Sequence, residues 1–122
     1  MGEDIKFIDH EEYLEVIFTG ERSFQAFDDL LEKVYENCKR NGTTKILLDV
    51  REAKGKWKDV DRFRVGEKAA HLFVASYVIL VIDEKEQINK LAENTAYNRG
   101  VKTLVTDDKR AGLDWLLKGF RS

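Results

Sequence analysis

Three short apolar segments, separated by longer amphipathic stretches, constrain the fold of this chain more than any other feature. They are Lys45–Val50, Tyr77–Asp83 and Lys102–Thr106. Short runs that are apolar on both faces are typical of strands in a sheet that helices cover on both sides. Because a helical pattern separates each run from the next, we predict right-handed crossovers and parallel pairing of the three strands.

The N-terminal part of the chain predicts a β-hairpin ahead of this alternating pattern. Two apolar runs, residues 5–9 and 13–19, flank a polar Asp-His-Glu-Glu sequence that is typical of a turn. In the second run, Leu14, Val16 and Phe18 share one face because side chains alternate along a strand. We therefore expect an antiparallel pair of strands at one edge of the sheet.

Four helices are expected between and after the strands. Apolar side chains at three- and four-residue steps predict the first helix between Ser23 as N-cap and Gly42 as C-terminal stop. The second helix is expected to begin at Asp59 or Asp61, and Asp107 or Asp108 is expected to cap the last helix. The predicted buried positions of the later helices are Val60, Phe63, Ala70 and Phe73, then Ile88, Leu91, Ala92, Thr95 and Ala96, then Ala111, Leu113, Trp115, Leu116 and Leu117.

The predicted order is ββαβαβαβα in one domain that spans residues 1–122. The fold class is α/β, with an N-terminal antiparallel hairpin joined to a mostly parallel five-stranded sheet and helices on both faces. A length of 122 residues suffices for one hydrophobic core, and 43% hydrophobic with 36% charged residues is a globular composition.

Charge and cysteine content narrow the class of function and the compartment. A net charge of −2 argues against bulk nucleic-acid binding. The charge is uneven: residues 1–40 hold 5 basic and 11 acidic residues, and residues 51–68 hold 7 and 4. This split favours docking to a partner or a second copy, unless both stretches are solvated helix faces.

One cysteine, no apolar leader and a longest apolar run of six residues indicate a cytoplasmic protein without a membrane span.

Several strings of residues resemble the SpoIIAA-like branch of the STAS superfamily, often called STAS/SEC14-domain proteins. They are Tyr13-Leu14-Glu15-Val16 with the helix through Cys38, the run from Ile46 to Arg51, and Ala96-Tyr97-Asn98-Arg99-Gly100-Val101 followed by Thr106-Asp107 and Asp114-Trp115-Leu116. The resemblance covers nearly the whole chain. It implies four helices around a five-stranded sheet, and a protein that acts as a switchable protein-binding module or as a binder of apolar ligands.

The chain departs from that family where the anti-anti-sigma relatives carry their regulatory chemistry. In those relatives a serine at the start of the second helix, just after the central strand, is phosphorylated. Residues 51–72 of this chain contain neither serine nor threonine. The phosphoserine switch is therefore not carried over, and plain partner binding remains.

Polar residues collect at the predicted carboxyl ends of the parallel strands, where open α/β sheets bind ligands. These residues are Asp49, Arg51, Asp83, Thr106 and Asp107. Three converging carboxylates are able to hold Mg²⁺ or to form a phospho-acceptor pocket. We favour the structural alternative, in which Asp83 and Asp107 accept bonds from helix starts and Asp49 pairs with Arg51 or Arg99.

Two other positions are candidate binding residues. The Arg99 guanidinium, next to Asn98, is able to form two parallel hydrogen bonds with a carboxylate or phosphate, or to hold a helix against the sheet. Trp57 lies among lysines in an expected loop. There it would anchor a partner, stack on a base or touch a membrane surface, or else fold over the core.

The candidate binding residues are thus Asn98, Arg99, Trp57, Asp49 and Arg51, with no predicted catalytic residue, metal site or cofactor. The sequence has no Ser/His/Asp elbow, no GxGxxG motif and no P-loop. The two histidines and Cys38, which is expected in the core, lack metal-ligand spacing.

Three functions compete on these grounds. The leading hypothesis is a non-enzymatic interaction module that forms a homodimer or binds another protein. The alternative is a carrier of a small apolar, lipid-like molecule in a pocket lined by Phe24, Phe27, Phe63 and Phe73. A hydrolase or phosphotransfer enzyme that uses the acidic strand ends is the least expected.

Overall fold

The structure is a computed structural model that describes residues 4–73 and 76–119. The strands are β1 (Ile5–Asp9), β2 (Leu14–Phe18), β3 (Lys45–Asp49), β4 (Val78–Ile82) and β5 (Lys102–Thr106). They lie side by side in chain order in one sheet, in which β1 and β2 are antiparallel and all later neighbours are parallel. The predicted hairpin and the parallel pairing are confirmed.

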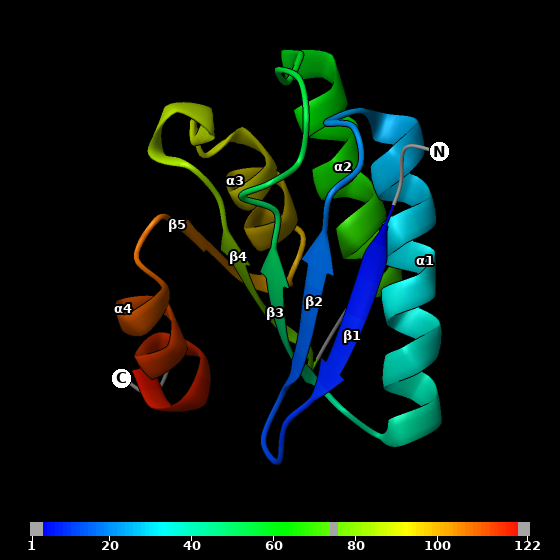
Figure 1. The fold of residues 1–122 in the computed structure, drawn as a ribbon, viewed down its shortest axis with the longest axis vertical. Coiled ribbons are helices and arrows are strands. Elements are labelled where there is room, and N and C mark those ends of the chain that lie inside the picture. The colour runs from blue at the N-terminus through cyan, green and yellow to red at the C-terminus, as the bar shows by residue number, and fades with distance from the viewer. Residues whose placement is uncertain (1–3, 74–75, 120–122) are drawn as a thin grey trace.

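The helices divide unequally between the two faces of the sheet (Figure 1). The helical elements are α1 (Phe24–Asn41), α2 (Asp59–Leu72), a 3-10 turn η1 (Lys85–Gln87), α3 (Leu91–Asn98), α4 (Lys109–Asp114) and a π-helical turn η2 (Trp115–Gly119). The first three α-helices pack on one face, and α4 with η2 packs on the other. This arrangement confirms the order ββαβαβαβα with helices on both faces. In the described residues, no helix has the length and apolar character to cross a bilayer.

Side-chain alternation along the strands builds a core on each side of the sheet. Leu48 and Ile79 pack under α1, α2 and α3. Their chain neighbours Leu47 and Leu80 point the other way and pack with Leu116 of η2. The near-continuous apolar sequence of β3 and β4 follows from this two-sided burial.

Local signals at the helix ends behave as predicted. The Ser23 hydroxyl accepts a hydrogen bond from the Ala26 N–H at 3.2 Å, and Gly42 adopts the left-handed conformation at φ 70°. Asp108, rather than Asp107, caps α4 by accepting from the Ala111 N–H at 3.0 Å.

The prediction for the buried face of α2 is half wrong. Ala70 and Phe73 are buried, but Val60 is 61% and Phe63 39% exposed. The buried face follows positions 62, 66, 69 and 73, which are spaced by three and four residues. That face carries the buried small residues Gly66 and Ala69 together with Arg62 and Phe73, so Val60 and Phe63 lie outside it.

The start of the third helix also differs from the prediction. Ile88 lies ahead of α3, because the chain first forms η1 and then places Lys90 in the left-handed conformation at φ 71°. Thr95 and Ala96 are buried as expected. The side chain of Ala92 lies outside the described part of the structure.

Candidate functional site

A cavity of about 90 Å³ lies between the sheet and the three helices that cover its first face. Most of its wall is apolar and includes Phe27, Leu31, Leu48, Trp57, Val65 and Ile79. Charged and amide side chains line the rest, from Arg62 on α2 and from the segment between Asp83 and Glu93.

Small residues on two neighbouring helices create this space. Gly66 and Ala69 of α2 and Ala96 of α3 line the cavity and are buried. Their short side chains leave volume that a leucine at the same position would fill. Protein interiors otherwise pack at near-crystalline density, so this hollow is a specific feature of the site.

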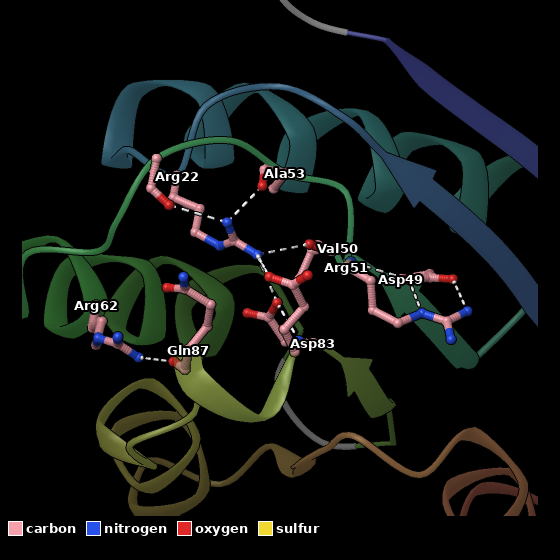
Figure 2. A network of polar contacts seen from close by, with 10 residues as sticks. Arg22, Asp49, Val50, Arg51, Ala53, Arg62, Asp83 and Gln87 are labelled. Carbon is pink, nitrogen blue, oxygen red and sulfur yellow. Dashed lines mark hydrogen bonds and ion pairs between the residues drawn. The ribbon is translucent and has the colours of Figure 1, made fainter.

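A buried ion pair lies next to the cavity. Arg22 Nη2 donates to Asp83 Oδ1 at 2.8 Å, and the two side chains are only 3% and 6% exposed. Arg22 also donates to the carbonyl oxygens of Val50, Ala53 and Gly55. This one guanidinium therefore ties the start of α1 to the loop after β3 and to the end of β4 (Figure 2).

Asp83 has a second partner at the start of η1. Its Oδ1 atom accepts a hydrogen bond from the Glu84 N–H at 2.7 Å. The expectation that Asp83 accepts from a helix start is therefore met in part, with the buried Arg22 added. Asp83 lines the cavity wall, but Arg22 balances its charge.

Arg62 is the charged residue on the cavity wall with the weakest pairing. Its Nη1 atom donates to the Gln87 carbonyl at 2.7 Å (Figure 2). Its Nε atom is buried, has no hydrogen-bond partner among residues 4–73 and 76–119, and lies 3.8 Å from Oδ1 of the exposed Asp59. Burial lowers the pKa of the Arg62 guanidinium, although the carboxylates of Asp59 and Asp83 oppose this shift.

A separate polar cluster lies on the opposite face of the sheet. His10 Nε2 is 2.7 Å from Glu15 Oε1, and Lys109 Nζ is 3.3 Å from Glu15 Oε2. Burial by itself would raise the pKa of the Glu15 carboxyl, but the hydrogen bonds from His10 and Lys109 outweigh it and lower that pKa. This cluster holds the hairpin to the start of α4.

Asp49 and Arg51, two of the predicted site residues, form a local pair near that cluster. Arg51 donates through Nε and Nη2 to the two carboxylate oxygens at 3.0 and 2.8 Å. Burial would raise the pKa of the Asp49 carboxyl, yet the bonds from Arg51 outweigh burial and lower it. The pairing of Asp49 with Arg51 was one of the two alternatives expected from the sequence.

Asn98 and Arg99 lie at the other end of the sheet from Asp49 and Arg51. They close α3 just before β5 begins, beside the first residue of β4, whereas Asp49 ends β3 beside the last residue of β4. Arg99 is 3.4 Å from a Glu67 carboxylate oxygen. The five predicted residues are thus not brought together in one site.

Trp57 joins the cavity wall instead of standing out from the surface. Its ring meets the Phe27 ring edge-on, with centroids 4.7 Å apart. Of the phenylalanines predicted to line a pocket, only Phe27 does so within the described wall. Phe73 belongs to a buried cluster with Tyr35 and Tyr77.

The acidic strand ends do not converge on a metal site. Among residues 4–73 and 76–119, no group of three His, Cys, Asp or Glu side chains is arranged to hold an ion. Cys38 is buried in the core, and burial raises the pKa of its thiol to about 11.

Sequence reasoning missed Arg22 and Arg62, the two arginines nearest the cavity. Arg22 directly precedes the N-cap of α1, where the positive end of the helix dipole disfavours a cation. That conflict was a readable sign that Arg22 has a carboxylate partner elsewhere. Arg62 carried no comparable signal, because its inward orientation depends on how α2 packs.

The sheet and its helices define an α/β protein of SpoIIAA-like architecture, with a partly open cavity between the sheet, α2 and α3. Among solved structures, the chain is similar to an uncharacterized protein of the DUF3478 family with a SpoIIAA-like fold from Shewanella loihica PV-4. The two share 19% sequence identity with a TM-score of 0.57, and the match covers 94% of each chain. No protein-family model and no curated protein matches this chain. The similarity establishes the fold and confirms the resemblance at that level.

Proposed function

We propose that this chain is a non-enzymatic cytoplasmic binding protein that holds a small apolar molecule in the cavity between the sheet, α2 and α3. The observation that carries the proposal is the cavity itself, which is lined mainly by apolar side chains in an otherwise close-packed core. The function considered second on sequence grounds thus becomes the first candidate.

The size of the cavity limits the ligand. An enclosed apolar cavity of roughly 150 Å³ is known to stay dry and bind benzene. At about 90 Å³, this cavity suits a slimmer group, such as a short alkyl chain, or a molecule that partly protrudes. Ligands as large as a phospholipid would require α2 and α3 to separate.

The charged groups on the wall support binding over catalysis. Asp83 is held by Arg22 at 2.8 Å, and Glu93 is held by Lys90 at 3.1 Å. Glu93 and Lys90 also bond the backbone of Val105 on the edge strand β5. Carboxylates engaged in this way fix the wall of the site, and neither is poised as a general base.

Trp57 offers a direct test because it lies on the cavity wall. In a Trp115→Phe background, titration with 1-pentanol should give a saturable change in Trp57 emission. Ala96→Leu should abolish the change by filling the cavity, and Ala69→Val is a smaller filling variant if Ala96→Leu does not fold. Val60→Ala, at an exposed position of α2, is the matched control that should leave the response intact.

Two results would overturn this proposal. One is a change that stays linear with pentanol concentration, as expected for a solvent effect on an indole. The other is a saturable change that survives in a folded cavity-filling variant, since the alcohol would then bind elsewhere.

A second candidate function is self-association through the outer surface of α2 and α3. Large apolar side chains are exposed on both helices: Val60 at 61%, Phe63 at 39% and Tyr97 at 60%. Exposed apolar residues on neighbouring elements favour an interface, and the acidic N-terminal third with the basic stretch 51–68 favours a second copy as partner. Sedimentation equilibrium should show a dimer that Phe63→Ser with Tyr97→Ser dissociates, and a monomer at all concentrations would contradict it.

A further inference from the structure

We infer that the ligand of this cavity carries an anionic group, a carboxylate, which Arg62 binds. The inference rests on the proposed function and deepens it by naming the chemical class of the ligand, a small apolar acid. It comes from the way in which the charges around the cavity are paired.

Among the residues that the structure describes, four charged residues line the cavity, and three of them have a close partner. Lys90 and Glu93 pair with each other at 3.1 Å, and Asp83 pairs with Arg22 at 2.8 Å. In the same part of the chain, the one carboxylate paired with Arg62 is Asp59, at 3.8 Å. Buried charges are normally paired, so the pairing around this cavity is incomplete at Arg62.

The Arg62 side chain is largely buried, at 14% exposure, whereas that of Asp59 is 79% exposed. Asp59 also accepts a hydrogen bond from the Asn89 side chain at 3.2 Å. Water therefore screens the Asp59 charge, while the guanidinium faces a low-dielectric wall. The lowered pKa of Arg62 agrees with a cation whose charge is poorly compensated.

The hydrogen bonding of the guanidinium is incomplete on one edge. Nη1 is occupied by the Gln87 carbonyl, and within the described residues the edge formed by Nε and Nη2 has no hydrogen-bond acceptor, although Arg62 lines the cavity. A carboxylate binds such an edge through two parallel N–H···O bonds. Arg22 is unsuited to this role, because its donors already serve Asp83 and three carbonyls.

A matched pair of ligands tests the inference. Pentanoate and 1-pentanol, which have the same chain length and differ in the acidic group, are titrated by calorimetry at pH 7 into the full chain. We expect pentanoate to bind at least about tenfold more tightly, as a charge-assisted bond to a buried group would give. Arg62→Gln should remove this preference by weakening the binding of pentanoate far more than the binding of 1-pentanol.

A measurement on the unaltered protein covers the case in which Arg62→Gln does not fold. The carboxyl ¹³C signal of bound pentanoate should titrate at a lower pH than that of free pentanoate, because a neighbouring guanidinium favours the ionised form. Matched affinities for the two ligands, or a bound carboxyl that titrates like the free acid, would overturn the inference. If neither ligand binds, the proposed function itself fails.

Discussion

At the residue scale, the best-supported interaction is the buried bond between Arg22 and Asp83, which joins residues 61 positions apart in the sequence. The position of Arg22 beside the N-cap of α1 indicates that it has a carboxylate partner, but no local pattern identifies Asp83 as that partner. The caps at Ser23 and Gly42, by contrast, follow from neighbouring residues alone and were predictable.

Removal of Arg22 should therefore be costly. Arg22→Met leaves the Asp83 carboxylate buried without its cation, which we expect to lower the free energy of unfolding by about 3–5 kcal/mol. Urea denaturation measures the change. Lys33→Met, which breaks the exposed 3.0 Å pair with Asp29, is the control and should cost less than about 1 kcal/mol. Equal losses in the two variants would contradict the structural role of Arg22.

Asp49 makes the stability of the protein depend on pH. The bonds from Arg51 lower the pKa of the folded carboxyl, so its stabilisation is present above the ordinary aspartate pKa and is lost as pH falls through the lowered value. Because Arg51 is 45% exposed, we expect Asp49→Asn to cost only about 1 kcal/mol at pH 7. The difference from the unaltered chain should shrink below about pH 4 in urea denaturation. If the difference in free energy of unfolding grew on acidification instead, the pKa of Asp49 would be raised in the folded state, contrary to this prediction.

At the scale of elements, the order of strands and helices along the chain was predictable, but helix orientation was not. Period-two and three-to-four-residue patterns locate each element, whereas the face that packs depends on its neighbours. In α2, the small residues Gly66 and Ala69 turn inward together with Arg62, so Phe63 lies outside. The cavity is a product of that orientation, and for this reason sequence patterns did not predict its wall.

Close packing of α4 on β4 gives a sharp test of the second core. A Cβ atom at Gly112 would lie 2.7 Å from Leu80 Cδ1 and 3.2 Å from Thr106 Cγ2. Gly112→Ala should destabilise the fold by about 1–3 kcal/mol through overpacking, despite the better helix propensity of alanine. A double-mutant cycle with Leu80→Ala should show that the smaller side chain relieves part of this cost. A Gly112→Ala variant as stable as the unaltered chain would show that α4 lies farther from β4 than it does in the structure.

At the scale of the whole molecule, the two faces of the sheet have different characters. The face under α1, α2 and α3 holds the larger core and the cavity, whereas α4 and η2 pack only on part of the opposite face. Glu15 and Asp49 lie on that second face, where partners from the hairpin, α4 and the loop after β3 satisfy them. This division explains why β2 carries Glu15 among apolar residues and why β3 ends in Asp49.

Cys38 reports on the integrity of the larger core. Its thiol is buried, with a pKa raised to about 11, so it is neither exposed nor ionised in the folded state. At pH 8, a thiol reagent should label it only as fast as the core opens, and stabilising the fold should slow labelling in proportion. Labelling as fast as that of the urea-unfolded chain would contradict a buried position.

The proposed function depends most on the cavity as a binding site. Methyl-labelled protein titrated with pentanoate and observed by NMR tests this directly. We predict saturable shifts at Leu31, Leu48, Val65 and Ile79, which line the cavity, with little change at the exposed Val60. Shifts centred on Val60, or no saturable shift at the methyl groups of the four cavity residues, would contradict binding of pentanoate in the cavity.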